Sequence, residues 1–295
     1  MHHLLLLFLT CAAVAAPPAW PDAILRLERQ ASGANVAQIS TALCVAPGLL
    51  ATILEHSAAG DTYRVPGTGG TTAVKLLARD ADSGFALLAP VEKEAPAWQV
   101  IALGDPAPAP PAGTSLTLQS AAPAPARAAG RDVLHKGKLL QTPWLRIHLP
   151  AGTWNRGTPL TTADGAFAGL LAGSVPGVPE AARALPAGAV RHFVKLWTDR
   201  QTLARAELGL RLRHADGIPR VAECYAALPA ERAGLHPGDV ILSIADESVP
   251  DAAAVAAACF LLRADEPVKI EVLRGMEVVA LNVTPVAVTP RSPGP

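Results

Sequence analysis

Short apolar segments, separated by turns rich in glycine and proline, recur along the first two thirds of this 295-residue chain. They cover residues 39–45, 72–77, 85–88, 114–119, 144–149 and 166–171. Runs of this length between turn residues are typical of strands in all-β barrels and sandwiches. We therefore expect a mostly β protein, in which residues 22–30 are a candidate helix before the first strand.

Proline-rich stretches divide this β region. Residues 105–111 read DPAPAPP and cannot donate hydrogen bonds to a sheet ladder, so we expect them to connect two barrels. Residues 121–126, AAPAPA, are expected to form a loop inside the second barrel. A helix over residues 189–197 would close this part of the chain.

Charge and histidine spacing exclude several classes of partner. The chain has 25 Lys and Arg and 25 Asp and Glu, hence no formal net charge, and it lacks a basic tract, so nucleic acid is not an expected partner. The eight histidines include no i, i+4 pair on a predicted helix. We expect no metal site and no cofactor. The length predicts about two domains.

The N-terminus predicts export. Residues 4–16 are apolar and end in small residues, which indicates a secretory signal peptide over residues 1–16 that is too short to span a bilayer. A lipoprotein anchor at Cys11 is the alternative, although Thr10 before it fits poorly. We expect a periplasmic or secreted bacterial protein without a stable membrane span.

Cleavage would leave Cys44, Cys224 and Cys259. An odd number of cysteines without a C-x-x-C pair is not a disulfide framework. A bridge between Cys224 and Cys259 and two buried free thiols both remain open.

Three segments resemble bacterial HtrA (Do-like) serine proteases. Residues 46–55 (APGLLATILE), 80–88 (DADSGFALL) and 154–160 (WNRGTPL, followed by a D-G pair) are similar, in this order, to the SPGLVLTNAH, DPxSDLALL and GNSGGPL segments of that family. The resemblance implies a trypsin-like (chymotrypsin) fold of two β-barrels over residues 22–197. It places Glu55, Gly84 and Arg156 where the family has its catalytic histidine, aspartate and serine.

These three residues cannot perform the chemistry of the triad. A serine nucleophile needs a base, and the base needs an acceptor that fixes its tautomer. Gly84 has no acceptor, and the arginine guanidinium neither deprotonates nor attacks a carbonyl group. Trp154 and Thr158 also replace glycines of the family motif. We therefore expect a pseudoprotease, in which Glu55 and Arg156 either form an ion pair or are separately solvated.

An active serine endopeptidase with a displaced catalytic site is the alternative. After a one-residue insertion, His56 aligns with the catalytic histidine, because residues 56–60 (HSAAG) resemble HVVAG of the family. The nucleophile would then have to be a hydroxyl such as that of Thr158 or Ser174.

Residues 206–284 resemble a PDZ domain of the HtrA type. The similarity lies in Leu208-Gly209-Leu210, in residues 229–235 (PAERAGL, similar to SPAEKAGL) and in residues 236–241 (HPGDVI, similar to KPGDVI). A helix capped by Asp251 and running through Leu262 should follow, then strands 268–273 and 277–283. The proline-rich residues 285–295 are expected to be a disordered tail.

The resemblance implies that Leu208, Gly209 and Leu210 bind peptide. Backbone N–H groups of such a loop hold a C-terminal carboxylate, and glycine allows close approach. The alternative is that the groove docks internally on the barrels. The family implies protein tails or unfolded polypeptide as ligands, homotrimers or hetero-oligomers with an active homologue, and a scaffold or regulatory role in envelope protein quality control.

Overall fold

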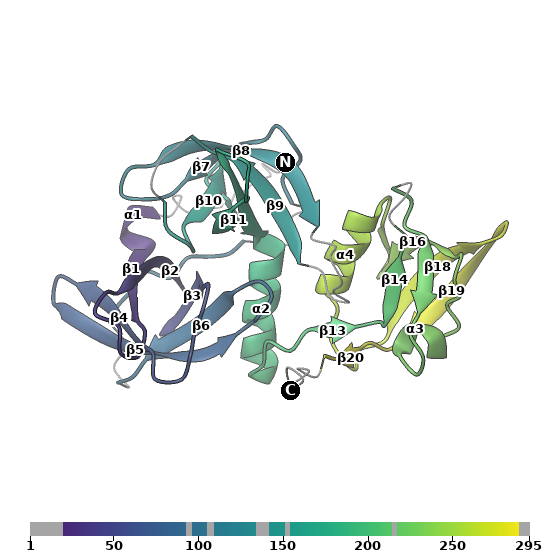
Figure 1. The fold of residues 1–295 in the computed structure, drawn as a ribbon, viewed down its shortest axis with the longest axis horizontal. Coiled ribbons are helices and arrows are strands. Elements are labelled where there is room, and N and C mark those ends of the chain that lie inside the picture. Colours follow the sequence, from purple (N-terminus) through teal and green to yellow (C-terminus); the bar gives the residue numbers. More distant parts are fainter. Residues whose placement is uncertain are drawn as a thin grey trace, which may run out of the picture.

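The structure is a computed structural model that describes residues 20–92, 96–104, 109–133, 142–150, 154–213 and 217–288. The expected signal peptide, with Cys11, and part of the connector 105–111 lie outside these residues. Two barrels lie side by side, and a smaller domain of strands and helices follows them (Figure 1). Most of the regular structure is strand, so the expected mostly β fold is confirmed.

The first barrel closes six antiparallel strands in the order β1-β2-β3-β6-β5-β4. Its strands are β1 (Ile24–Gln30), β2 (Gln38–Ala46), β3 (Leu49–Ile53), β4 (Thr62–Gly67), β5 (Gly70–Arg79) and β6 (Phe85–Pro90). In β4, Tyr63 and Val65 are buried between exposed neighbours, which is the alternation expected for a strand with one face on a core.

The expected helix over residues 22–30 is wrong. Only α1 (Trp20–Ala23) is helical, and residues 24–30 form β1. This strand pairs with both β2 and β4 and so closes the barrel. It also buries Leu27 completely and directs Arg29 toward Asp61, where Nε lies 2.7 Å from Oδ2. These long-range contacts outweigh the local preference for a helix.

The second barrel closes in the order β10-β11-β12-β9-β8-β7. Its strands are β7 (Ser115–Leu118), β8 (Ala124–Val133), β9 (Pro143–His148), β10 (Pro159–Thr162), β11 (Phe167–Ser174) and β12 (Ala181–Pro186). The expected loop at residues 121–126 is therefore only partly correct, because β8 begins at Ala124. The start of a strand tolerates proline, and β8 places Ala126 and Ala128 in the core.

Helix α2 (Ala187–Arg200) packs on both barrels. Its Val190 and Phe193 are completely buried in the hydrophobic cluster between the barrels, and the ring of Phe193 stacks 4.9 Å from that of Phe85 in β6. The expected helix over residues 189–197 is confirmed within these bounds. The helix carries the chain from the second barrel to the third domain.

The third domain combines three small sheets with two helices. Its elements are β13 (Ala206–Glu207), β14 (Leu210–Leu212), β15 (Val221–Cys224), α3 (Pro229–Arg232), β16 (Val240–Ile244), β17 (Glu247–Ser248), α4 (Ala252–Phe260), β18 (Val268–Arg274), β19 (Glu277–Val283) and β20 (Val286–Ala287). The side chain of Asp251 accepts a hydrogen bond of 2.7 Å from the amide of Ala254, so the expected cap is confirmed.

The tail departs from expectation at its start. Residues 285–295 were predicted to be disordered, yet Val286 and Ala287 form β20, which pairs with β13. The backbone of β13 thereby gains a hydrogen-bonding partner. Residues 289–295 lie outside the described part of the chain.

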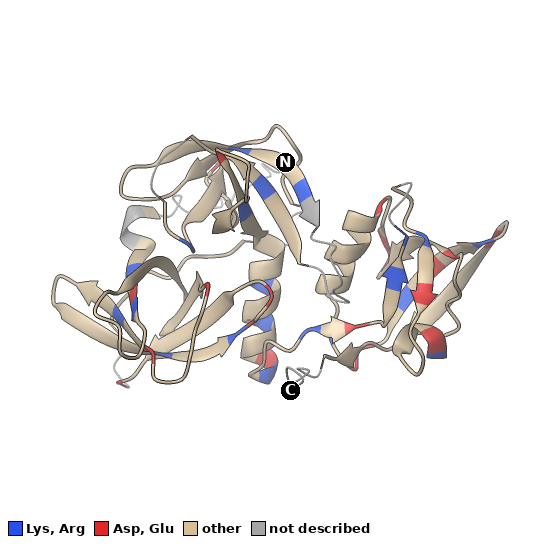
Figure 2. Cartoon of the chain, in the orientation of Figure 1, with Lys and Arg blue, Asp and Glu red and all other residues tan. Residues whose placement is uncertain are grey.

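Charged residues are scattered over all three parts of the fold. Both basic and acidic residues occur on the barrels and on the third domain, without a long basic stretch in the part of the chain that is drawn in colour (Figure 2). Among the described helices, none is long and apolar enough to cross a membrane.

Candidate functional site

Glu55, Gly84 and Arg156 lie together in the cleft between the barrels. Glu55 follows β3, Gly84 precedes β6 and Arg156 precedes β10, and all three line one hollow of about 440 Å³. Glu55 and Arg156 also line a second hollow of about 420 Å³ beside it. The structure therefore brings together the three residues that the sequence aligned with a catalytic triad.

Arg156 and Glu55 form an ion pair. The distance between Nη2 of Arg156 and Oε2 of Glu55 is 2.7 Å, and Nη1 of Arg156 donates to the carbonyl oxygen of Ala172. The ion pair considered from the sequence is thus confirmed. The side chain of Arg156 is 35% exposed and that of Glu55 is 50% exposed. Water therefore screens the pair, and its contribution to stability is small.

Gly84 occupies a position that excludes a side chain. Its φ is +72°, and a Cβ atom built on it would lie 2.6 Å from the carbonyl oxygen of Leu54. The amide of Leu54 donates a 2.8 Å hydrogen bond to the carbonyl oxygen of Gly84, which holds the two segments together. With this backbone, an aspartate at residue 84 would need both a left-handed conformation and a displacement of Leu54, which follows β3.

The loop that carries Arg156 is tied to the first barrel through its backbone. The amide of Thr41 in β2 donates a hydrogen bond of 2.7 Å to the carbonyl oxygen of Arg156. The amide of Gly157 donates to the carbonyl oxygen of Leu171 in β11. Thr158 is 2% exposed; its hydroxyl donates to the carbonyl oxygen of Asn155 at 2.7 Å and lies 3.2 Å from the hydroxyl of Thr41. Thr158 is thus a buried structural residue.

His56 and Ser174 lie at the surface of the cleft. The side chain of His56 is 73% exposed, and its Nε2 lies 3.9 Å from Oε1 of Glu55. Ser174 lines the same hollow of about 420 Å³ as His56. Within the described residues these two side chains form no hydrogen bond with each other.

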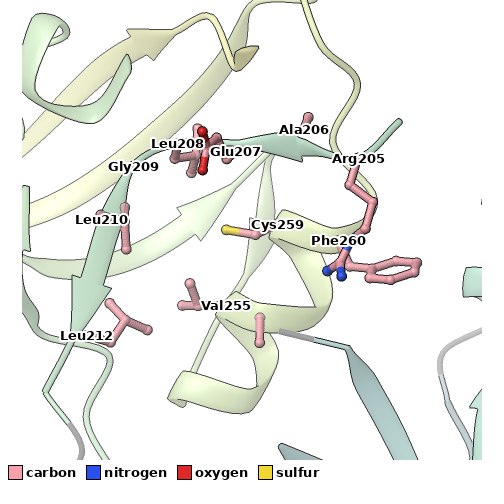
Figure 3. A pocket seen from close by; sticks show the side chains of 11 residues that line it. Arg205, Ala206, Glu207, Leu208, Gly209, Leu210, Leu212, Val255, Cys259 and Phe260 are labelled. Atoms are coloured by element: carbon pink, nitrogen blue, oxygen red, sulfur yellow. The ribbon is translucent and has the colours of Figure 1, made fainter. Parts of the chain in front are cut away.

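The second candidate site is a groove between β14 and α4. Leu210 and Leu212 line it from the strand, Val255 and Cys259 line it from the helix, and Leu208 closes one end (Figure 3). Its volume is about 60 Å³. Burial raises the pKa of the Cys259 thiol to about 12, so this wall of the groove is neutral.

Gly209 shapes the closed end of the groove. Its φ is +75°, and a Cβ atom there would overlap the side chain of Leu228. The carbonyl oxygens of Leu208 and Gly209 accept hydrogen bonds from the amides of Ala230 and Tyr225, at 2.7 and 2.8 Å. Both carbonyl groups therefore point away from the groove, into the body of the domain.

The amides at this end are not used by the backbone of the domain. Because the amide of Tyr225 donates to Gly209, the facing pair Leu210 and Cys224 is of the type without hydrogen bonds between its members. The N–H group of Leu210 therefore points away from β15, toward α4. The amides of Leu208 and Gly209 donate no backbone hydrogen bond within the described chain.

The end of α4 packs against the barrel domain. Phe260 is 2% exposed, and its ring lies 5.2 Å from that of Phe193 and 6.0 Å from that of His192, both on α2. Helix α4 also contacts β8 and β9 (Figure 1). The end of α4 therefore takes part in both contacts, because Phe260 packs on the barrel domain and also lines the groove.

Arg205 joins the same contact and was not expected from the sequence. Its guanidinium carbon lies 4.5 Å from the centroid of the Phe260 ring, and its Nη1 lies 3.6 Å from Oδ2 of Asp82 in the first barrel. A single arginine in a polar linker gives no sequence signal for such a contact, because its partners are distant in the chain. Cys44, Cys224 and Cys259 are free thiols, so the bridge left open between Cys224 and Cys259 is absent.

Comparisons with known proteins agree with this architecture. Residues 206–284 match the family model described as PDZ domain. No curated protein matches the chain. Two solved structures of the HtrA-type protease AlgW, one with a tripeptide and one with a decapeptide, are each 18% identical to it. The match to the tripeptide complex covers 92% of this chain and 98% of the AlgW chain, with a TM-score of 0.68. The match to the decapeptide complex covers 91% of this chain and 96% of the AlgW chain, with a TM-score of 0.64.

A serine endoprotease from Yersinia pestis is 15% identical, with 93% of this chain and 100% of that chain covered and a TM-score of 0.59. At these identities the likeness concerns the fold. The chain therefore has the fold of HtrA-type proteases, with a trypsin-like domain of two six-stranded barrels followed by a PDZ domain at residues 206–284.

Proposed function

We propose that this protein is an exported, proteolytically inactive HtrA-like protein that binds protein C-termini or unfolded segments through its PDZ domain. It would act in the bacterial periplasm, or after secretion, as a scaffold or regulator in envelope protein quality control. The observation that carries the proposal is the contrast between its two sites. An ion pair and a glycine without room for a side chain occupy the positions aligned with the triad, whereas the amides of Leu208 and Gly209 in the PDZ domain donate no backbone hydrogen bond within the described chain.

The chemistry of the cleft supports loss of catalysis. Acyl transfer needs a nucleophile in hydrogen-bond reach of a base. Glu55 is instead paired with Arg156, whose guanidinium carries a fixed positive charge. Losing several triad members together removes the base and the nucleophile as a unit.

The PDZ groove supports peptide binding. A C-terminal carboxylate would accept hydrogen bonds from the amides of Leu208, Gly209 and Leu210, and the peptide would extend β14 as an added strand. The solved AlgW structures are described with a tripeptide and a decapeptide, which suggests the same class of ligand for this chain.

Two assays test the loss of catalysis. The purified protein is incubated with an unfolded protein substrate and, separately, with a serine-reactive fluorophosphonate, beside the variants Arg156→Ala, Ser174→Ala and His56→Ala. We expect no turnover and no labelling in any of them. Turnover by the wild type that disappears in Ser174→Ala or His56→Ala would instead establish the alternative, an active serine endopeptidase with a displaced catalytic site.

Peptide binding is tested separately, with a fluorescent peptide that ends in a free carboxylate and its C-terminally amidated twin. The wild type should bind only the free acid, and Gly209→Ala should bind neither, because the added methyl group would displace Leu228 and the loop. Equal binding of acid and amide would contradict recognition of a C-terminus.

Assembly is part of the same proposal. The protein would form homotrimers or join hetero-oligomers with an active homologue. Copurification of a tagged form with such a homologue, followed by light scattering of each species, separates this role from that of a free-standing binder.

A further inference from the structure

Strand β19 forms one edge of the four-stranded sheet of the PDZ domain, in which the order is β17-β16-β18-β19. It is seven residues long, whereas β17 at the opposite edge has only two. The hairpin of β18 and β19 projects from the domain on the side away from the barrels (Figure 1). The barrels therefore leave this edge uncovered.

The turn of the hairpin determines which backbone groups of β19 are free. Gly275 and Met276 separate the paired residues Arg274 and Glu277, and the register then runs along both strands without a shift. In a two-residue hairpin the pair next to the turn is hydrogen-bonded, and such pairs alternate along the strands. The N–H and C=O groups of residues 278, 280 and 282 therefore point away from β18. Within the described chain, these groups have no backbone partner.

Nothing in the strand protects this edge. Native proteins usually block a free edge with lysine, proline, a bulge or a very short strand. The sequence of β19 is EVVALNV, without lysine or proline, and its pairing has no bulge. Met276 is 98% exposed and Val278 is 63% exposed, and they are two of the three most exposed large hydrophobic residues in the described chain. The edge is thus suited to pair with another strand.

The free edge is complementary to a second copy of itself. In an antiparallel pair centred on Ala280, Val278 of each copy faces Asn282 of the other. The outward N–H and C=O groups of all three residues then meet as hydrogen-bonded pairs. Glu277, the only charged residue of the strand, faces Val283 of the second copy, so no like charges are brought together.

The same register also joins the apolar faces of the two sheets. Val279 and Leu281 are half-buried and pack against the core cluster of the PDZ domain. Across the pair, Val279 of one copy faces Leu281 of the other at a position without hydrogen bonds, where side chains lie closest. The contact would therefore bury the exposed parts of these side chains against each other.

We propose that β19 is a self-association surface, through which two copies of this chain pair antiparallel about a two-fold axis at Ala280. The pairing joins two four-stranded sheets into one continuous sheet. The surface lies outside the groove between β14 and α4, so the inference does not depend on peptide binding. Seven residues from each copy make a small interface, and we expect a dissociation constant of about 10 µM.

Hydrogen exchange of the purified full chain tests the pairing. Exchange is measured at about 1 µM and about 100 µM, below and above the expected dissociation constant. About four fifths of the chains are paired at the higher concentration, so the outward amides in residues 277–283 should exchange about fivefold more slowly there. Peptides from the barrels report separately on any assembly of the trypsin-like domain.

Ala280→Pro removes the central outward N–H group. Because this group does not bond to β18, the hairpin should stay intact, as edge strands tolerate proline on their free side. We expect the slower exchange at high concentration to disappear. Val91→Lys is the control for a change at an exposed position elsewhere, since Val91 is 56% exposed and lies outside β19, and it should behave like the wild type.

Two charged double variants test the register. One carries Val278→Lys with Asn282→Lys, and the other carries Val278→Glu with Asn282→Glu. Residues 278 and 282 face each other across the pair, so each variant alone places like charges opposite one another and should stay unpaired at about 100 µM. A mixture of the two places opposite charges together and should pair, as sedimentation velocity will show.

Three results would overturn the proposal. The first is exchange of residues 277–283 that does not depend on concentration in the wild type. The second is slow exchange at high concentration that persists in Ala280→Pro and in both charged variants, because another surface would then be the contact. The third is failure of the two charged variants to associate when mixed, which would exclude the register centred on Ala280.

Discussion

Nη2 of Arg156 lies 2.7 Å from Oε2 of Glu55, so an ion pair bridges the two barrels in the cleft. The two side chains come from the segment after β3 and the loop before β10, which are far apart in the sequence. Because both remain partly exposed, the pair defines the shape of the cleft more than it stabilises the fold.

Glu55→Gln tests this conclusion. The substitution removes the charge of one partner and keeps its size, and we expect the free energy of unfolding to fall by no more than about 1 kcal/mol. Urea denaturation, in a double-mutant cycle with Arg156→Gln, isolates the coupling between the two residues. A coupling above about 3 kcal/mol would be the behaviour of a buried pair and would contradict the exposure found here.

Gly84→Asp should destabilise the protein and should not restore proteolysis, even when combined with Glu55→His and Arg156→Ser. The φ of +72° and the approach of a Cβ atom to the carbonyl oxygen of Leu54 both oppose a side chain. We expect a loss of about 2 kcal/mol or more.

Gly177→Asp is the matched control for this loss. Gly177 has the same φ of +72°, but a Cβ atom there would have nothing within 4 Å. Gly177→Asp should therefore lose only the part of the free energy of unfolding that comes from the left-handed backbone conformation. Equal destabilisation of the two variants in thermal unfolding would mean that contact with Leu54 contributes nothing.

His192 predicts a loss of stability in acid. Burial, and then the charges of Arg263 and Arg205, lower the pKa of His192 from 6.5 to about 4. Its Nε2 is buried and, within the described residues, has no hydrogen-bond partner. Between these two pKa values the unfolded chain binds a proton at His192 that the folded chain does not bind. The contribution of this residue to the free energy of unfolding is therefore fully present above pH 6.5 and is lost as the pH falls to about 4.

The slope from this one group is at most about 1.4 kcal/mol for each pH unit. Unfolding measured across that window should show it in the wild type and lose it in His192→Gln. His56→Gln, which changes a solvent-exposed histidine, should keep the wild-type slope. An unchanged slope in His192→Gln would assign the pH dependence to other groups.

The ion pair of Asp239 and Arg274 should make the stability of the PDZ domain depend on pH as well. Nε and Nη2 of Arg274 donate to the two carboxylate oxygens of Asp239 at 2.9 and 2.8 Å. Burial alone would raise the pKa of Asp239, but these bonds and one from the amide of His236 hold it below 3.8. The stabilisation is therefore present above about pH 4 and is lost as the pH falls further.

Asp239→Asn should lower the free energy of unfolding of the PDZ domain by about 2 kcal/mol at neutral pH. Arg211→Gln, which breaks the exposed pair of Arg211 with Glu223, should change it by less than about 1 kcal/mol. Hydrogen exchange at increasing denaturant, followed by mass spectrometry of peptides from residues 206–284, separates this domain from the barrels. A loss in Asp239→Asn no larger than in the control would contradict the role of the bidentate pair.

The sequence predicted best where a local pattern determines the structure. Asp251 caps α4, and the strand pair around Gly275 follows from apolar runs that flank a glycine turn. The aligned positions 55, 84 and 156 meet in space because strand ends of a two-barrel fold converge in the cleft. The ion pair was one of two arrangements that the residue types allowed.

Other features depend on contacts between distant residues and had no local signal. The segment of β1 contains charged residues that suit a helix, and only its pairing with β2 and β4 makes it a strand. The pairing of β20 with β13 ordered residues expected to be a tail. The contact of Arg205 with Phe260 and Asp82 joins a linker, a PDZ helix and a barrel loop, which no single stretch of sequence reveals.

Cys259 and Phe260 are consecutive residues of α4 that both line the groove beside β14, and the ring of Phe260 also packs against His192 and Phe193 of α2. A ligand wide enough to push α4 away from β14 must also pull Phe260 out of that packing. The barrel domain thereby stiffens a groove that it does not line. A PDZ fragment cut free of the barrels would lose this restraint on α4.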